Sequence, residues 1–400
     1  MTSSRPSLDH IPADSSTGPL AGLQVVELAG IGPAPFAAML LGDLGADVIR
    51  IDRAGGHAGN PVPPHKDLLN RNRRSIELNL KDAGDLEVAK TLISSADVLI
   101  EGYRPGVTER LGLGPDECLA LNPRLVYGRM TGWGQSGPLA QRAGHDINYI
   151  SRVGVLDPIG PRDGAPVIPL NIVGDFGGGG MLLAFGLLAA VHHANATGVG
   201  QVVDAAITDG SALLATMLHA WRAADLWTDE RASNMLDGGA HFYHVYRTAD
   251  DRYLSVGAIE PQFYRAFLSG LGVAAEGDWI AGHDDASLWP AMTERVGEIV
   301  RRRTLDEWLQ IFEGTDACVS PVLTVAEAIE DDHNSARSTF LEVDGVQQPA
   351  PAPRFDRTPA PLPRRQPTPG EHSSEIRSAL ADSTGWPSVA VEAHRKESNV

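Results

Sequence analysis

The first third of the chain alternates between short apolar runs and longer segments whose apolar residues recur at helical spacing. Residues 23–28 (LQVVEL) predict a strand, residues 35–45 (PFAAMLLGDLG) a helix, and residues 46–52 (ADVIRID) a second strand. A strand, a crossover helix and a strand form a unit in which both strands run in the same direction. The pattern therefore predicts a parallel sheet that is covered by helices.

The same alternation continues further along the chain. Residues 87–96 (EVAKTLISSA) predict a helix and residues 97–103 (DVLIEGY) a strand. After a short helix that ends near Leu121, residues 124–132 (RLVYGRMTG) predict another strand. This repetition is typical of the α/β fold class.

The middle of the chain is glycine-rich and apolar. Residues 167–176 (VIPLNIVGDF) predict a strand that runs into a loop, and glycines 177–180 then open an apolar helix that continues to about His193. Residues 201–228 carry apolar residues at helical spacing and predict one long helix.

The second half has a different pattern. The turn TADDR (248–252) between two strand-like runs predicts an antiparallel hairpin, and a small α+β domain is the simplest interpretation of about residues 235–300. Residues 347–370 hold many prolines and predict an extended strap over the surface, which a short helix near 371–381 follows. The polar ends of the chain, among them residues 1–19, are typical of disorder.

Composition narrows the class of protein. Lys plus Arg number 33 against 51 for Asp plus Glu, a formal net charge of -18, which argues against general binding to nucleic acid or to anionic membranes. The two cysteines, Cys118 and Cys318, indicate neither a disulfide framework nor a zinc site, so we expect a reducing, cytoplasmic location. The start of the chain shows no apolar leader, and the run from Met181 to Val191 is too short to span a bilayer, so no membrane association is expected.

Arginines gather locally in this acidic chain. The cluster comprises Arg50, Arg53, Arg71, Arg73, Arg74 and, later, Arg110. One interpretation of this cluster is a phosphate site, because a guanidinium group can bind two phosphate oxygens at once. Solvated surface charge is an equally good interpretation. The sequence leaves both open.

The stretch after the first predicted strand partly resembles a dinucleotide fingerprint. Gly30 and Gly32 have the required spacing, and Asp52 ends the second strand, where an NAD-binding protein places its ribose acid. However, the third glycine position is Pro35, and Arg53 follows the acid directly. A strand-to-helix turn with proline at the helix start is the better interpretation.

Three residues are candidates for acid–base chemistry. His145 titrates near neutral pH and could act as a base or be a buried structural histidine, and its neighbour Asp146 could orient a turn. Asp175 precedes four glycines and a helix, where backbone amides favour an anion and glycines admit a ligand, although a helix cap is the alternative. Glu260 lies among apolar residues before a proline and would need a partner such as a protonated histidine. The pair His192 and His193 has no third ligand at useful spacing, so no metal is assigned.

Five segments together resemble one family. They are GHDINY (144–149), GDFGGG (174–179), NMLDGGA (234–240), GAIEPQFY (257–264) and TDACVSPVL (315–323). In this order they are similar to the α-methylacyl-CoA racemases, within the family III CoA-transferase superfamily. The resemblance covers about residues 20–381.

The resemblance implies an α/β fold in an interlocked homodimer, with a large Rossmann-like domain whose parallel sheet is built from both chain ends. The implied parts are an N-terminal tail (1–19), a large CoA-binding domain (20–205 plus 330–381), helical linkers (206–234 and 301–329), a small α+β middle domain (235–300) and a C-terminal tail (382–400). The active site would lie between the large domain of one subunit and the small domain of the other.

The activity implied is racemisation of 2-methylacyl-CoA thioesters by 1,1-proton transfer through an enolate. The resemblance makes His145, Asp175 and Glu260 catalytic, with Glu260 paired to His145. The CoA contacts it implies are Arg53, Leu78, Asn79, Leu80 and Arg110, together with the backbone of Gly144, His145, Asp146, Ile147, Asn148 and Tyr149. No metal or redox cofactor is required, because CoA is part of the substrate.

An alternative remains within the superfamily. In a family III CoA-transferase, Asp175 would form an acyl anhydride and CoA would pass to another carboxylic acid. His145 favours the racemase, because the transfer route does not need a histidine there. Two positions depart from the racemase pattern: Asn79 stands where Asp is usual, and His241 stands where Pro is usual.

Overall fold

The structure, a computed structural model, describes residues 17–55, 62–382 and 385–387. Most of the segments expected to be disordered at the two chain ends lie outside these residues. The chain divides into two compact units. The large unit takes the residues up to Tyr149, Asn171–Ser211, and those from Ser338 onward, and the small unit takes Ile150–Leu170 and Ala212–Arg337.

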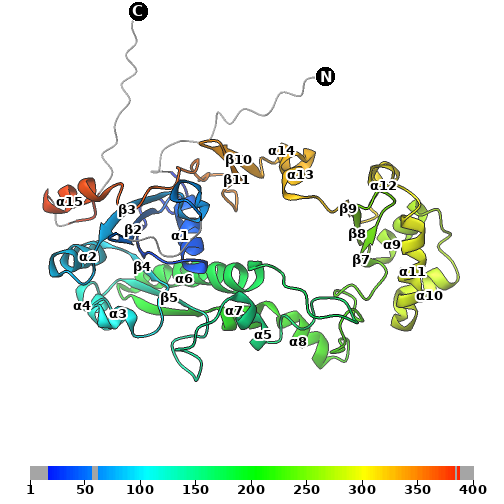
Figure 1. Ribbon diagram of the computed structural model, residues 1–400, viewed down its shortest axis with the longest axis horizontal. Coiled ribbons are helices and arrows are strands. Elements are labelled where there is room, and N and C mark those ends of the chain that lie inside the picture. Colours follow the sequence, from blue (N-terminus) through cyan, green and yellow to red (C-terminus); the bar gives the residue numbers. More distant parts are fainter. Residues whose placement is uncertain (1–16, 56–61, 383–384, 388–400) are drawn as a thin grey trace, which may run out of the picture. The chain divides into compact units, whose positions relative to one another are not determined.

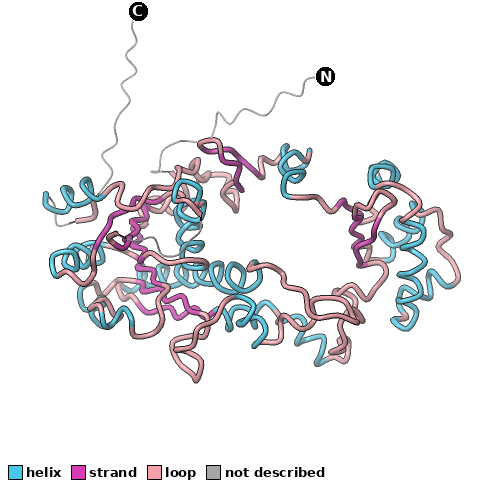
Figure 2. The backbone as a smooth tube through the Cα atoms, in the orientation of Figure 1, coloured by secondary structure: helices cyan, strands magenta, loops and turns pink. Residues whose placement is uncertain are grey.

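The large unit is built on a six-stranded parallel sheet, which confirms the α/β class (Figure 2). Its strands are β1 (Gln24–Leu28), β2 (Asp47–Arg53), β3 (Arg73–Leu78), β4 (Val98–Glu101), β5 (Val126–Thr131) and β6 (Gln201–Ala206). The spatial order is β3-β2-β1-β4-β5-β6, the order of a doubly wound Rossmann fold. Because the order reverses between β1 and β4, a crevice is expected at the carboxyl ends of these strands.

Helices cover both faces of this sheet (Figure 1). On one face, α1 (Pro33–Asp43) and α6 (Leu182–Thr197) pack their small and branched side chains against the strands. On the other face lie α2 (Ala83–Ser95), α4 (Pro115–Leu121) and α15 (Ser373–Asp382). A short helix, α3 (Val107–Arg110), follows β4. Both faces of each central strand are therefore buried, which explains the continuous apolar runs in the sequence.

Two strands differ from the sequence-based prediction. β3 carries the polar sequence RRSIEL, which gave no strand signal, and β6 occupies the first residues of the segment predicted as one long helix. The rest of that segment forms two shorter helices, α7 (Ile207–Leu214) and α8 (Thr216–Ala223). Each of these strands pairs with a strand distant in sequence, β2 or β5, so tertiary pairing overrides the local pattern.

The segment that leads into α6 also differs. Residues 167–171 are irregular, and Ile172–Met181 (η3) forms a π-helical stretch in place of the predicted strand end. Its glycines lie against protein: a Cβ added at Gly178 would come within 2.7 Å of the Ser211 backbone, and one at Gly180 within 2.6 Å of the Phe36 ring. Gly178 and Gly180 therefore allow close packing of α1 and α7. The sequence had suggested that the glycines admit a ligand, but these two leave no open space for one.

The continuous helical segment Ile172–Thr197 is long and apolar enough to cross a bilayer by length and composition. This corrects the expectation that the apolar run is too short. In the structure, Leu183 and Leu187 are fully buried in the core of the large unit, and α6 packs against β5 and β6. One face of the segment thus packs in the core of the large unit, whereas Ile172, Met181 and Phe185 are exposed.

The C-terminal segment completes the large unit. An antiparallel pair, β10 (Phe340–Val343) and β11 (Val346–Pro349), precedes an irregular strap that runs to residue 370. The strap and the start of α15 bind the edge strand β3, where Gly370 N donates to Ser75 Oγ at 2.8 Å and Glu77 N donates to Ser373 Oγ at 3.0 Å. Both chain ends therefore build the unit, although all six strands of its sheet lie between Gln24 and Ala206.

The small unit contains the predicted antiparallel hairpin. The strands β7 (Tyr243–Arg247) and β8 (Tyr253–Gly257) pair as expected, and β9 (Val319–Pro321) adds a third strand beside β8. Its helices are α9 (Pro261–Gly270), α10 (Asp278–Asp284), α11 (Trp289–Val300), α12 (Leu305–Phe312), α13 (Val325–Glu330) and α14 (Asp332–Ala336). Aromatic residues such as Phe242, Tyr264 and Trp308 fill a core that belongs to this unit alone.

Candidate active site

A pocket of about 480 Å³ lies at the carboxyl ends of the first four strands of the large unit. Its walls come from the residues that follow β1 (Ala29–Ile31), β2 (Asp52 and Arg53), β3 (Leu78–Lys81) and β4 (Tyr103). The strap closes one side with Pro367 and Pro369. This is where a doubly wound sheet places its ligand.

The pocket brings together four of the residues predicted to contact CoA. Arg53, Leu78, Asn79 and Leu80 all line it, whereas Arg110 and residues 144–149 do not; α3 contributes Val107 to the wall. Arg53 and Arg110 are exposed, and neither forms an ion pair within the described part of the chain. They are therefore available to an anion. Asn79 Oδ1 accepts from Lys81 N at 3.2 Å and so shapes the turn at the pocket edge.

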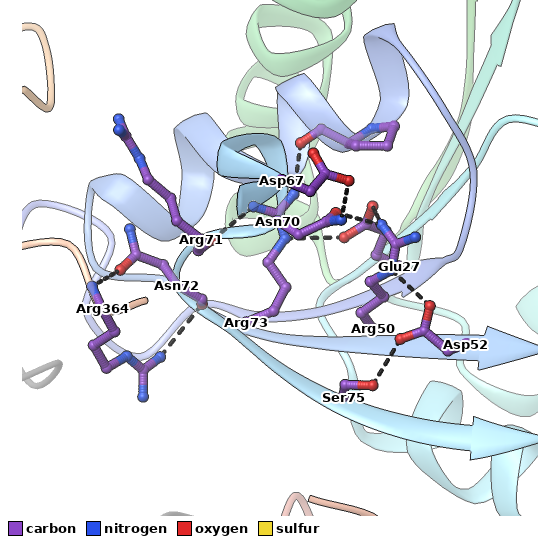
Figure 3. A network of polar contacts seen from close by, with 11 residues as sticks. Glu27, Arg50, Asp52, Asp67, Asn70, Arg71, Asn72, Arg73, Ser75 and Arg364 are labelled. Atoms are coloured by element: carbon purple, nitrogen blue, oxygen red, sulfur yellow. Dashed lines mark hydrogen bonds and ion pairs between the residues drawn. The ribbon is translucent and has the colours of Figure 1, made fainter. Parts of the chain in front are cut away.

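The other arginines of the cluster are committed to the protein. Arg73 and Arg50 both bind the fully buried Glu27, with N–O distances of 3.0 and 3.2 Å (Figure 3). Arg71 binds Asp43 at 2.5 Å and Arg74 binds Asp47 at 2.6 Å, and all four arginines are buried. Solvated surface charge does not hold for these four, because a buried guanidinium that is paired with a carboxylate serves the fold. Arg50 also lines the pocket, whereas Arg71, Arg73 and Arg74 do not, so the phosphate interpretation fails for those three.

The acid at the end of β2 is also committed. Asp52 accepts from Arg50 Nε at 3.0 Å and from Ser75 Oγ at 2.6 Å (Figure 3). These bonds occupy the carboxylate that an NAD site would use for the ribose. The structure thus favours the interpretation of the β1–α1 connection as a strand-to-helix turn, with Pro33 opening α1.

Residues 144–149 form a compact turn that leads into helix α5 (Asp146–Arg152). Tyr149 folds back so that its hydroxyl donates to Gly144 O at 2.5 Å, and its ring packs edge-on against Trp133. A Cβ at Gly144 would lie 2.8 Å from the Tyr149 ring, so glycine is required there. His145 stays exposed at the start of the helix, where Asn148 Oδ1 accepts from its backbone N at 3.0 Å.

Asp175 lies in the first turn of η3, next to the turn that carries His145. Its backbone N donates to Asp146 Oδ2 at 2.7 Å, and its Oδ2 accepts from Asn171 Nδ2 at 3.3 Å. Asn171 occupies the N-cap position, so Asp175 is not the helix cap that the sequence left open. The structure therefore brings Asp175 and the His145–Asp146 turn together from segments far apart in sequence.

The surroundings of Asp175 suit a proton-transfer group. Its side chain is half-buried, and this burial raises its pKa above the ordinary aspartate value. The Asn171 hydrogen bond opposes the rise, the charge of Asp146 adds to it, and the charge of His145 opposes it. A perturbed carboxyl beside an exposed histidine is the kind of arrangement that acid–base catalysis uses.

One loop joins the pocket to this pair. Ala29, Gly30 and Ile31 line the pocket, and a Cβ at the next residue, Gly32, would lie 3.6 Å from Asp175 Oδ2. The φ of +73° at Gly32 also favours glycine. The loop of residues 29–32 thus runs from the pocket wall to Asp175.

The third predicted catalytic residue belongs to the small unit. Glu260 is exposed at the N-cap position of α9, in front of Pro261. Its charge contributes to raising the pKa of the Cys318 thiol, after the effect of burial. The pairing of Glu260 with His145 stays a prediction.

His241 is a core residue of the small unit. It is fully buried, and its Nε2 lies 2.7 Å from Tyr264 Oη. The sequence identified it as a departure from the racemase pattern, because proline is usual at this position. Because the His241 side chain has no exposed surface within the small unit, it cannot line a substrate site on that unit.

Two polar residues of the pocket had no signal in the sequence. Asp67 and Asn70 lie in the connection between β2 and β3 and line the pocket, and Asn70 Oδ1 accepts from Arg50 Nη1 at 2.5 Å. They come from an irregular segment in which single polar residues are common. No spacing or motif could have distinguished them.

Comparison with known proteins identifies the family of the chain. The sequence matches CoA-transferase family III over residues 20–373. The chain belongs to CoA-transferase family III. Alpha-methylacyl-CoA racemase of Mus musculus is 44% identical over 360 residues, which cover 89% of this chain and 92% of the mouse protein. The Homo sapiens protein of the same name is 44% identical over 359 residues, with the same two coverages.

A solved structure supports the fold as well. The crystal structure of a CAIB/BAIF family protein from Brucella suis superposes with a TM-score of 0.79 at 26% sequence identity. The match covers 91% of this chain and 100% of that chain. The resemblance inferred from the five sequence segments is therefore confirmed at the level of the family.

Proposed function

We propose that this family III protein is an α-methylacyl-CoA racemase that interconverts the R and S forms of 2-methylacyl-CoA thioesters. The observation that carries the proposal is the meeting of His145 and Asp175 beside the pocket. Inversion at a carbon needs one proton-transfer group on each face of that carbon. The two related racemases add support, because they are 44% identical over most of the chain.

The pocket would hold the CoA part of the substrate. Arg53 offers an exposed guanidinium to a phosphate oxygen, and Leu78 and Leu80 offer apolar surface from the end of β3. The thioester would then follow the 29–32 loop to Asp175. This arrangement places the reacting carbon outside the pocket, at the turn of residues 144–149.

The reaction would proceed through an enolate. One of His145 and Asp175 removes the proton alpha to the thioester carbonyl, and the other returns a proton to the opposite face. The raised pKa of Asp175 makes its carboxylate a stronger base than an exposed aspartate. The backbone N–H of Asp175 is already bound to Asp146, so the enolate oxygen must take its donors from other groups.

The quaternary arrangement is part of the proposal. We propose an interlocked homodimer in which Glu260 of one subunit pairs with His145 of the other, and a cytoplasmic location as expected from the sequence. Light scattering on the purified protein measures the mass of the assembly. Co-expression of His145→Ala and Glu260→Gln chains then tests the shared site: activity above that of either variant alone supports it, and no recovery contradicts it.

A family III CoA-transferase is the alternative, with which the family match is also consistent. There the Asp175 carboxylate would attack the thioester carbonyl, the carbon–sulfur bond would break, and CoA would leave as the thiolate. A second carboxylic acid would later receive the CoA. This route needs Asp175 but gives His145 no part.

Deuterium exchange separates the two functions. The purified protein is incubated with one epimer of a 2-methylacyl-CoA in deuterated water, without an acyl acceptor. Racemisation with deuterium at the alpha carbon supports the proposal, and His145→Ala should abolish exchange from at least one epimer. Formation of a new CoA ester from added carboxylic acid, with no exchange and no effect of His145→Ala, would establish the transferase.

A further inference from the structure

We infer that Asp146 is a positioning residue for Asp175: its carboxylate fixes the backbone that carries Asp175 and holds a negative charge beside the reacting carboxyl. The inference rests on the proposed function and adds to it a residue with a defined part. Asp146 follows the proposed base His145 directly in sequence, which at first suggests an adjacent acid–base pair. The geometry assigns it a different task.

The hydrogen bond gives the first argument. Asp175 N donates to Asp146 Oδ2 at 2.7 Å, a short bond to a charged acceptor. It joins α5 to η3 across 29 residues of sequence. Because the bond holds the backbone of Asp175 itself, a change at Asp146 moves the reacting carboxyl directly.

Burial gives the second argument. Asp146 is 5% exposed, and its Oδ1 has no hydrogen-bond partner among the residues that the structure describes. Burial of a carboxylate with one oxygen unpaired is costly, and a residue needed only to hold the turn could be an asparagine or a serine. A full negative charge at this position therefore has a use beyond the hydrogen bond.

That use is visible at Asp175. The charge of Asp146 raises the pKa of Asp175 in addition to burial, whereas Asn171 and His145 act in the opposite direction. Tyr149 is the other titratable group close by, and Asp175 in turn raises its pKa after the effect of burial. A higher pKa at Asp175 strengthens it as a base towards a weakly acidic carbon.

The elements packed against η3 add no competing charge. These are α1, α6, β5, β6 and α7, whose Asp209 is exposed and does not contribute to the raised pKa of Asp175. Most of their charged or titratable groups have partners: Asp43 pairs with Arg71, Arg129 pairs with Glu101, Asp204 accepts from Gln135 N, and Tyr127 donates to Leu113 O. His192 and His193 lie near the far end of α6. Asp146 is thus the carboxylate that sets the charge beside Asp175.

Two substitutions separate the two tasks. Asp146→Asn keeps an oxygen that accepts from Asp175 N but removes the charge, so the acid limb of the kcat/KM profile should move to lower pH. Asp146→Ala removes both, and we expect kcat to fall by about 10-fold or more, which corresponds to about 1.4 kcal/mol. Asp204→Asn is the control, because Asp204 also accepts from a backbone N–H, of Gln135 at 3.2 Å, but is exposed. It should leave the profile unchanged.

A measurement without substrate keeps the test independent of the proposed function. Carbon-13 labelling of the aspartate carboxyls, with Asp175→Asn for assignment, gives the titration of Asp175 by NMR. A midpoint that falls in Asp146→Asn supports the inference even if the native enzyme catalyses no exchange, which would refute only the racemase. An unchanged midpoint in folded Asp146→Asn overturns the inference, whatever the activity. If Asp146→Ala does not fold, Asp146→Asn alone decides.

Discussion

The large unit buries ionised side chains, whereas the small unit buries a neutral histidine. In the large unit, Glu27 has no exposed surface and accepts from Arg50 and Arg73, so each charge is compensated by a neighbour. In the small unit, His241 has no exposed surface either, and it lies among Phe242, Tyr264, Trp279 and His283 with no charged partner.

The hydrogen bonds of the small cluster decide the state of His241. Tyr264 Oη donates its single proton to Trp279 O at 2.8 Å, so His241 Nε2 must donate to Tyr264. His241 Nδ1 then carries a lone pair and is buried without a partner in the described part of the molecule. A second proton would find no acceptor there. Burial, and then the nearby His283, lowers the pKa of His241 to about 4.

The difference predicts which change should destabilise each unit. A buried network of paired charges does not tolerate the loss of one member, because the remaining charge stays buried and unpaired. A buried neutral histidine is stable among apolar neighbours, but protonation destabilises the fold because it buries an unpaired charge. The following predictions test this contrast, from the largest expected effect to the smallest.

Glu27→Ala should cost the most stability. It leaves Arg50 and Arg73 buried without their shared carboxylate, and we expect a loss of about 3–5 kcal/mol in the free energy of unfolding. Urea denaturation followed by circular dichroism measures it. A loss below about 1 kcal/mol would show that water or other groups replace Glu27.

His241→Gln should remove an acid sensitivity of the small unit. The unfolded chain binds a proton at this histidine near pH 6.5 and the folded chain only near pH 4, so the unfolded state holds more protons between these values. Stability is therefore lost as the pH falls from about 6.5 to about 4, by about 3 kcal/mol from this group. The glutamine keeps a donor for Tyr264 but does not titrate. The urea midpoints of the two proteins should agree at neutral pH and diverge in acid, where the wild type alone loses the stability of this group; parallel curves would contradict the argument.

Arg53→Ala sharpens the contrast between arginines of one cluster. Arg53 is exposed and lines the pocket, so we expect CoA to bind about 10-fold more weakly while the free energy of unfolding stays unchanged. Arg73→Ala should instead lower the free energy of unfolding, because Arg73 is buried against Glu27. Isothermal titration with CoA, beside urea denaturation, measures both. Equal loss of stability in the two variants would refute the division of the cluster.

Glu87→Ala gives the smallest effect. Glu87 pairs with Lys90 on the surface of α2 at 3.0 Å, and both side chains are partly exposed. An exposed pair of this kind contributes about 0.3–0.5 kcal/mol, so the urea midpoint should hardly move. A loss comparable to that of Glu27→Ala would show that burial is not what distinguishes the two glutamates.

Local patterns predicted much of the large unit. β1, β2, β4 and β5 are short segments rich in apolar residues because both of their faces are covered, and such segments are visible in a sequence. β3 could not be predicted in this way, since its arginines, Arg73 and Arg74, are buried only because Glu27 and Asp47 meet them from other strands. The same limit applies to the cluster itself, where composition did not distinguish the free Arg53 from the buried Arg73.

The candidate site shows the same division between sequence and structure. The sequence by itself determined which residues could carry the chemistry, because GHDINY and GDFGGG fix residue types in order and define the family. Only the tertiary structure decided that Asp146 binds the backbone of Asp175, that the glycines after Asp175 serve helix packing, and that His241 is a core residue. These facts depend on contacts between segments far apart along the chain. Local propensity carries no information about such contacts, because the partner of each group is set by how the whole chain packs.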